Sequence, residues 1–216
     1  MPILAKTLEF LQTHQAEFWD KTAVHLRLSG VALLIGIVVG LLLGALAARN
    51  RAASPIVTNV IGAIRAIPSL AIMAVMLPII GVGFRPAVIA LTILAIPPVL
   101  INTQTGLTQV NPAILEAASG MGLTSWQIVW EVQLPLALPV IIAGIRTAAV
   151  EVLASATIGA IIGAGGLGEY VFSGLELGPS FIYLMLVGAL TIALLTFAAE
   201  MGLNLLEGAV RRRYYR

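Results

Sequence analysis

The chain contains few side chains that could perform covalent chemistry. It has no cysteine, which excludes disulfides, thiolate metal sites and cysteine nucleophiles. Its two histidines, His14 and His25, lie outside the long apolar stretches and form no ligand cluster. No G-x-x-x-x-G-K-[ST] phosphate loop occurs. We therefore expect no catalytic residue, no metal site and no cofactor on this chain.

One glycine-rich segment imitates a nucleotide-binding turn. Gly163, Gly165 and Gly168 have the G-x-G-x-x-G spacing of a dinucleotide fingerprint. They follow an apolar helical stretch rather than a strand, and no βαβ pattern surrounds them. We interpret the segment as a flexible turn at the end of an apolar helix.

Polar side chains inside apolar stretches are the second group of residues that could have a functional role, because burying a polar group in lipid is costly. Glu151 is predicted either to line a polar pathway or to pair with another helix, since Arg146 stands five residues away, a poor spacing for a helical pair. Arg65 is expected near a helix end, where it can extend to the membrane surface. Milder candidates for a polar lining are Asn102, Thr103, Ser155 and Thr157. A serine or threonine can instead bond to the backbone of its own helix.

The composition indicates the environment in which these residues lie. Of the 216 residues, 59% are hydrophobic and 10% are charged, against roughly 25% charged in an ordinary soluble domain. The mean hydropathy is +1.02. These values exclude a disordered chain, a soluble globular enzyme and a nucleic-acid binder with a broad basic face. An all-α protein that crosses the bilayer several times remains.

The hydrophobic pattern predicts about five membrane spans between residues 28 and 206. Residues 1–27 show no signal-peptide pattern, and their apolar residues recur at the spacing of an amphipathic helix lying in the membrane interface. Small residues in the fourth span leave open a division that would give six spans. The five expected spans are Leu28 to Ala48, Val57 to Ile80, Pro86 to about Thr103, Leu136 to Ile162 and Phe181 to Leu206.

The distribution of arginine predicts the orientation. Arg49 and Arg51 follow the first span, and a basic tail at residues 207–216 follows the fifth. Cytoplasmic segments carry an excess of lysine and arginine. Five spans place both groups, the C-terminus and residues 104–135 in the cytoplasm. Six spans with a cytoplasmic C-terminus would place the N-terminus there too.

Residues 111–135 have the pattern of two short helices joined by a sharp turn. Asn111 and Pro112 form a good helix start, because asparagine caps and proline fits the first position. Gly120 and Gly122 end that helix, and Thr124 opens a second one with the spacing of a capping box to Gln127. A rigid elbow of this kind could fit a groove on a soluble partner and transmit its motion. The alternative is an ordinary interfacial loop.

The same segment resembles the EAA signature of bacterial ABC-importer permeases. That signature reads Glu-Ala-Ala, three residues, Gly, nine residues, an aliphatic residue, any residue and Leu-Pro. Every position matches, at Glu116, Ala117, Ala118, Gly122, Val132, Leu134 and Pro135. The segments "RAIPSLA", "NTQTGL" and "IGAGGLGEYVFSG" are similar to the subfamily that imports glycine betaine, choline and carnitine. Methionine-importer permeases are similar to a lesser degree.

The resemblance implies a type I ABC importer permease fold in the bacterial inner membrane. It implies a second copy or a related permease, ATPase subunits that bind the elbow, and an external binding protein that delivers substrate. ATP and magnesium would belong to the ATPase, so this chain would not be an enzyme. Alternating access would move the substrate. An aromatic cage for quaternary ammonium groups is expected on the binding protein, because aromatic residues make up only 6% of this chain.

The resemblance also assigns roles to individual residues. Glu116 would anchor the elbow helix in a cleft of the ATPase, with Ala117 and Ala118 keeping the docking side slim and Gly122 allowing the reversal. Glu116 could instead only stabilise the helix through its charge. A second glycine row, Gly36, Gly40 and Gly44, has the GxxxG spacing of close helix packing, within the subunit or at a dimer contact.

Two other classes of protein stay open from the sequence. An ion-driven secondary transporter would often show inverted repeats, and no internal repeat is visible in the chain. A structural membrane subunit without a pathway would not need an elbow of this spacing.

Overall fold

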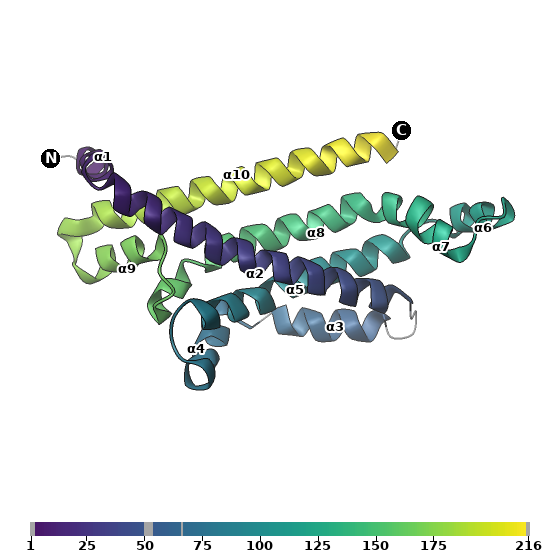
Figure 1. Ribbon diagram of the computed structural model, residues 1–216, viewed down its shortest axis with the longest axis horizontal. Coiled ribbons are helices and arrows are strands. Elements are labelled where there is room, and N and C mark those ends of the chain that lie inside the picture. The colour runs from purple at the N-terminus through teal and green to yellow at the C-terminus, as the bar shows by residue number, and fades with distance from the viewer. Residues whose placement is uncertain (1–2, 50–53, 66, 215–216) are drawn as a thin grey trace.

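The computed structural model describes residues 3–49, 54–65 and 67–214, and these contain helices and turns but no strand. Arg51 and Arg216, which contributed to the predicted orientation, lie outside the described residues. Four helical stretches are long and apolar enough to cross a bilayer: Gln15–Arg49, Phe84–Thr108, Ser125–Ser155 and Pro179–Tyr214. Figure 1 shows them running along the long axis of the molecule. The all-α polytopic fold expected from the composition is confirmed.

The four stretches carry the main helices, and shorter elements connect them. The main helices are α2 (Gln15–Arg49), α5 (Phe84–Thr108), α8 (Leu134–Ser155) and α10 (Ile182–Tyr214). The shorter ones are α1 (Ile3–Thr13), α3 (Ser54–Arg65), α4 (Ser69–Ile80), α6 (Pro112–Gly120), α7 (Ser125–Gln127) and α9 (Gly168–Glu176), with a π-helical turn η1 (Ile128–Gln133) and 3₁₀ turns η2 (Ile158–Ile162) and η3 (Pro179–Phe181).

The second predicted span is not one continuous helix. It is divided into α3 and α4, of 12 residues each. Twelve residues rise about 18 Å, less than the thickness of about 30 Å that a single spanning helix must cross. Pro68, which has no amide hydrogen and restricts the residue before it, stands at the start of α4. Figure 1 shows α4 turned away from the line of α3.

The ends of the other predicted spans also differ from the structure. The expected boundary between residues 27 and 28 falls inside α2, so residues 15–27 continue the first span as helix. The fourth span ends at Ser155 rather than Ile162, and it is not split into two spans. The expected tail at residues 207–216 is helical as far as Tyr214, because α10 continues into it. The first and fifth spans continue as helix into charged residues that hydropathy would exclude, and the fourth stops within an apolar stretch.

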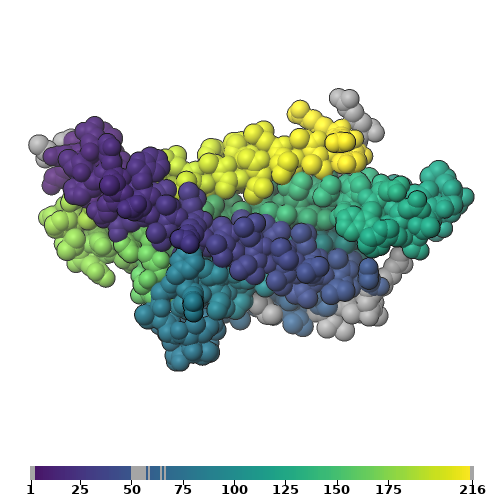
Figure 2. All heavy atoms as spheres, in the orientation of Figure 1, coloured from purple at the N-terminus to yellow at the C-terminus, as the bar shows by residue number. Residues whose placement is uncertain are grey.

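The core forms where α5 packs between α2 and α8. Leu28, Leu91, Val99 and Val152 are fully buried there. A smaller cluster joins α9, α10 and α1 around Leu167. Figure 2 shows that α6 and α7 project beyond the packed helices at one end, opposite α1 and α9. The molecule thus has a helical body, a protruding elbow at one end and a second small cluster at the other.

The glycine row of α2 lies on α5. A Cβ atom added to Gly36 would stand 2.4 Å from Cβ of Ala95, and one added to Gly40 would stand 2.7 Å from Cβ of Val99. Gly44 is equally close to Thr103. In lipid, helices gain stability from close backbone contact between small residues. These three glycines therefore pack within the subunit.

Candidate functional site

The elbow begins with helix α6, and a neighbouring side chain accepts a hydrogen bond from a free backbone amide at its start. The Asn111 side chain accepts a hydrogen bond from the amide of Ala113 at 3.0 Å, and Pro112 occupies the first helical position. This is the start that the sequence predicts, because capping depends only on residues two or three positions apart. The result is a defined two-turn helix, α6, rather than a loop.

A tight reversal follows α6. The amide of Leu123 donates to the carbonyl of Ala118 at 3.2 Å, and the amide of Gly122 donates to Ser119 at 3.0 Å. Gly122 has φ of +87°, in the left-handed region that strains residues with a Cβ atom. Gly120, by contrast, is the last residue of α6 and has an ordinary φ. Gly122 is therefore the residue on which the turn geometry depends.

The second arm of the elbow is capped and joins α8 without a break. The amide of Thr124 donates to the Gln127 side chain at 2.9 Å, and the amide of Gln127 donates to the Thr124 hydroxyl at 3.4 Å, which completes the capping box. The π-helical turn η1 then leads into α8. Pro135, the second residue of α8, has no amide hydrogen to donate to the carbonyl of Glu131, which accounts for a widened turn at this place. Residues 125–155 thus form one helical rod.

The elbow is tied to the body at its base and exposed at its tip. The Gln133 side chain donates to the carbonyl of Leu107 at the end of α5, at 2.9 Å. Glu116, Ala117 and Gly122 are exposed, and Leu134 and Pro135 are half-buried. Ala118, expected on the docking side, is only 2% exposed, so its small side chain packs inside the elbow.

Several large apolar side chains are exposed on the elbow, and Met121 and Trp126 are the most exposed of them. Met121 is 74% exposed at the turn, and Trp126 is 65% exposed beside Trp130, whose ring centroid is 5.3 Å away. Exposed apolar groups gathered on a protruding segment indicate an interaction surface. The motif spacing identifies Glu116 and Gly122 but not Met121, because its position in the motif accepts any residue.

Two arginines in the helical body form contacts with polar side chains on other helices. Arg65 at the end of α3 forms an ion pair with Glu151 on α8. Arg146 donates to Asn204 on α10 at 2.8 Å and lies 3.4 Å from Glu207. Of the two predictions for Glu151, the structure shows the pair with another helix. Arg65 is accordingly held by a partner rather than left to reach the membrane surface.

The four uncharged residues suggested as a polar lining of the pathway fall into two groups. The Asn102 amide donates to the carbonyl of Pro98 at 2.8 Å, and the Thr103 hydroxyl donates to Val99 at 2.7 Å, so both serve their own helix α5. Thr103 is buried against Gly44. Ser155 is half-buried at the end of α8. Thr157, just beyond it, lines a groove.

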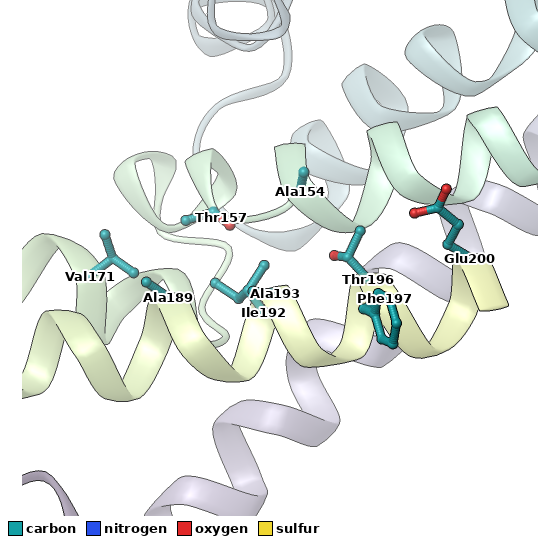
Figure 3. A pocket seen from close by; sticks show the side chains of 9 residues that line it. All are labelled: Ala154, Thr157, Val171, Ala189, Ile192, Ala193, Thr196, Phe197 and Glu200. Carbon is teal, nitrogen blue, oxygen red and sulfur yellow. The ribbon is translucent and has the colours of Figure 1, made fainter. Parts of the chain in front are cut away.

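This groove lies between the end of α8, α9 and α10. Its volume is about 450 Å³. Ala154 and Thr157 form one side, Val171 contributes from α9, and α10 forms the floor, as Figure 3 shows. The α10 residues that line it are Ala189, Ile192, Ala193, Thr196, Phe197 and Glu200. Thr196, Phe197 and Glu200 are functional candidates that the sequence reasoning missed, although their spacing of three and four residues places them on one helix face.

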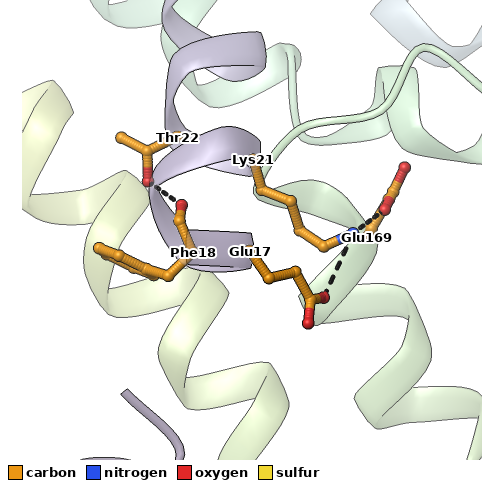
Figure 4. Close-up of polar contacts among 5 residues, drawn as sticks. All are labelled: Glu17, Phe18, Lys21, Thr22 and Glu169. Carbon is orange, nitrogen blue, oxygen red and sulfur yellow. Dashed lines mark hydrogen bonds and ion pairs between the residues drawn. The ribbon is translucent and has the colours of Figure 1, made fainter. Parts of the chain in front are cut away.

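At the opposite end from the elbow, a charged cluster fastens α2 to α9. Figure 4 shows Lys21 between Glu17 and Glu169. Its ammonium pairs with Glu169, lies 3.6 Å from Glu17 and stands 5.2 Å from the centre of the Tyr170 ring. Burial, reinforced by the charge of Glu17, raises the pKa of Tyr170 above its usual range, so its hydroxyl stays neutral. The cluster is a fastening rather than a reactive site.

The glycine turn at residues 163–168 packs against α2. Gly166 has φ of +88°, and a Cβ atom added to it would stand 3.2 Å from His25. The buried His25 donates through Nε2 to the carbonyl of Leu153 near the end of α8, at 3.1 Å. The turn therefore closes the end of α8 onto α2. Among the described residues, no group of three or more His, Asp or Glu side chains could hold a metal ion.

Comparison with known proteins decides the family. Residues 36–212 match the family described as binding-protein-dependent transport system inner membrane component. The chain belongs to this family. The resemblance to the permeases of ABC importers is confirmed by that match, and the multi-pass membrane architecture agrees with it.

Individual relatives cover almost the whole chain. The glycine betaine/carnitine/choline transport system permease protein OpuCB of Bacillus subtilis (strain 168) is 38% identical over 94% of this chain and 93% of its own length. The carnitine transport permease protein OpuCB of Listeria monocytogenes is 40% identical over 92% of this chain and 90% of its own. The osmoprotectant import permease protein OsmW of Salmonella typhimurium (strain LT2) is 34% identical over 93% and 95%.

Solved structures share the fold. A chain of the MetNI methionine ABC transporter in an inward-facing conformation has a TM-score of 0.77 and 25% identity, over 87% of this chain and 93% of that one. A chain of an amino acid ABC transporter with histidines has a TM-score of 0.70 and 22% identity, over 94% and 96%. The type I importer permease fold expected from the resemblance is confirmed.

Proposed function

We propose that the chain is the membrane-spanning permease subunit of an ATP-driven importer for quaternary ammonium osmoprotectants. The observation that carries this proposal is the elbow: a complete EAA signature on a capped, protruding helical turn with exposed Glu116, Met121 and Trp126. An ion-driven secondary transporter would have no use for such an elbow, because the elbow acts only when a soluble partner binds and moves it.

The substrate class is supported by the relatives. The names of the three relatives with 34–40% identity refer to betaine, carnitine, choline or osmoprotectants. Methionine is the second candidate, because a methionine transporter shares the fold at a TM-score of 0.77. Its lower identity of 25% makes it the weaker of the two.

The helical rod from Ser125 to Ser155 provides the mechanism of coupling. Closure of ATPase subunits would displace α6 and α7, and the unbroken helix would carry the displacement to the groove at the end of α8. The Gln133 contact would take α5 along with it. The chain performs no covalent step, and ATP with magnesium belongs to the ATPase.

The charge distribution supports an orientation. Figure 1 places the ends of α2, α5 and α10 at the elbow end of the molecule. Arg49 and Arg211 to Arg213 lie at those ends. We assign this end and the C-terminus to the cytoplasm of a bacterial cell, because basic residues concentrate there. The end with α1 and α9 then faces the external binding protein, and a second copy or a related permease completes the pathway.

A reconstituted complex tests the proposal. The chain is expressed with its candidate ATPase and binding protein, and ATPase activity is measured with glycine betaine, choline, carnitine and methionine. We expect stimulation by a quaternary amine. Glu116→Arg should abolish the stimulation, because it reverses the charge of an exposed anchor.

Glu116→Asp supplies the matched control. It keeps the negative charge at the same exposed position and should retain most of the stimulation. Stimulation by methionine alone would overturn the substrate class and keep the mechanism. Purification without an ATPase, with uptake that follows an ion gradient, would overturn the proposal.

A further inference from the structure

The groove between α8, α9 and α10 contains one carboxylate without a partner. Glu151, Glu200 and Glu207 are the acidic residues of α8 and α10. Glu151 pairs with Arg65, and Glu207 lies beside Arg146. Glu200 has no ion pair or hydrogen bond with any residue that the structure describes. A charge inside a membrane span is unfavourable unless something compensates it, which points to a cation from outside the chain.

A hydroxyl group in the same groove is also unused. Threonines in the helices of this protein regularly donate to the carbonyl four residues before them, as Thr147 does to Ala143 and Thr191 does to Val187. Thr196 departs from this rule: its buried hydroxyl has no partner. Figure 3 shows it pointing from α10 toward the end of α8. The hydroxyl therefore has unused hydrogen-bonding capacity in the wall of the groove.

The rest of the lining selects the kind of cation. A quaternary ammonium group has no N–H to donate, so it needs a negative charge, an aromatic face and apolar contact instead of hydrogen-bond acceptors. Phe197 and Glu200 are three residues apart on one face of α10, and Ala193 lies one turn before Phe197. The groove supplies the required groups together, and it is open on one side, which suits a site of short occupancy.

We propose that this groove is a transient binding site for quaternary ammonium groups, with Glu200 as the charge partner and Phe197 as the aromatic face. The proposal rests on the proposed function and adds the site. It has a consequence for selectivity. Choline carries a net positive charge, whereas glycine betaine carries a carboxylate that cancels it. Glu200 therefore stabilises choline more than glycine betaine.

Uptake into proteoliposomes that contain the complete importer, at saturating binding protein, tests the site. The measured quantity is the ratio of choline uptake to glycine betaine uptake in each variant. This ratio cancels defects of folding or coupling, because they reduce both substrates alike. Glu200→Gln should lower the ratio about tenfold, the effect of losing roughly 1.4 kcal/mol of preference. Glu200→Asp should retain most of it.

Phe197 provides a second test of the same site. Phe197→Leu should lower the uptake of both substrates several-fold, and Phe197→Tyr should keep it, because the aromatic face is preserved. Glu176→Gln is the matched control for charge: it removes an exposed carboxylate at the end of α9, outside the groove, and should leave the ratio unchanged.

The outcomes separate the site from the function. An unchanged ratio in Glu200→Gln, or an equal shift in Glu176→Gln, would overturn the site and leave the importer assignment intact. Loss of a co-purifying second permease in Glu200→Gln would assign the groove to a subunit contact and also overturn the site. Failure of the unaltered importer to take up either substrate would instead refute the proposed function.

Discussion

Individual charges in the helical body act as links between helices. Arg65 and Glu151 join α3 to α8, and Arg146 joins α8 to Glu207 and Asn204 on α10. The Arg65 and Glu151 side chains are 43% and 26% exposed in the isolated chain. Coupling between partly exposed charges is modest, and removing one partner leaves the other uncompensated. The ion pair is therefore one attachment of α3 to α8, in addition to the packing of α3 and α4 on α5.

A double-mutant cycle on Arg65 and Glu151 tests this attachment. We expect Glu151→Met and Arg65→Met each to lower the melting temperature of the purified chain in detergent. The double variant should lose less than the sum of the two, with a coupling energy of about 1 kcal/mol. Strictly additive losses would show that the two charges do not stabilise one another.

Sequence alone could not give these pairs. Arg65 and Glu151 are 86 positions apart, and Arg146 and Asn204 are 58 apart. No local rule connects positions so distant, because the contact depends on how the helices pack. For the same reason, the sequence could not identify Glu200. That its carboxylate has no partner can be seen only once the contacts between the helices are known.

At the scale of the element, contacts within three or four positions could be predicted. The Asn111 cap, the Gly122 reversal and the Thr124–Gln127 capping box all lie where the sequence places them. The helix ends at Ser155 and Gln15 could not be predicted. Hydropathy changes little at the first, where His25 and the glycine turn meet the end of α8. At Gln15, the helix includes charged residues that precede the apolar stretch, so hydropathy alone would begin the helix later.

The α2–α5 contact gives a prediction with an internal control. Gly36→Ala should destabilise the protein by several degrees in melting temperature, because the new Cβ would collide with Ala95. Gly30→Ala, on the same helix, meets nothing within 4 Å. It should be neutral or slightly stabilising, as alanine favours a helix by about 1 kcal/mol over glycine. Equal effects of the two substitutions would contradict the contact.

The elbow gives a second matched pair of glycines. Neither Gly120 nor Gly122 would bring a new Cβ near another atom, but only Gly122 has a positive φ. Gly122→Ala should therefore strain the reversal by about 1 kcal/mol or more and reduce substrate-stimulated ATPase activity. Gly120→Ala should retain it. The measurement is ATPase activity of the reconstituted complex at equal assembly, and a similar loss in both variants would point to crowding instead of backbone strain.

At the scale of the whole molecule, the two ends are built for different tasks. The elbow end carries exposed apolar groups and basic helix ends, and the other end is fastened by Lys21, Glu169 and His25. The rod from Ser125 to Ser155 connects them, and the groove lies where the rod stops. A displacement of the elbow would reach the groove as a movement of the end of α8 against α10.

The packing of α2 on α5 determines which ends of the molecule share a side of the membrane. Gly36, Gly40 and Gly44 lie against Ala95, Val99 and Thr103 in the same order, so the two helices run parallel and both end on the side of the elbow. Labelling of single cysteines identifies which side of the membrane that is. The absence of cysteine makes the test direct, because each introduced cysteine is the only thiol of the chain.

Labelling with a membrane-impermeant maleimide in right-side-out vesicles should distinguish the two ends. Leu177→Cys, beyond α9 and 55% exposed, should react in intact vesicles. Met121→Cys on the elbow and Ala209→Cys on the last part of α10 should react only after permeabilisation, since α3 and α4 cross as a pair and bring both to the cytoplasmic side. Reaction of Met121→Cys and Ala209→Cys in intact vesicles, with Leu177→Cys protected, would mean that the elbow faces outward. That outcome is incompatible with an ATPase bound to Glu116, because the ATP that drives it is inside the cell.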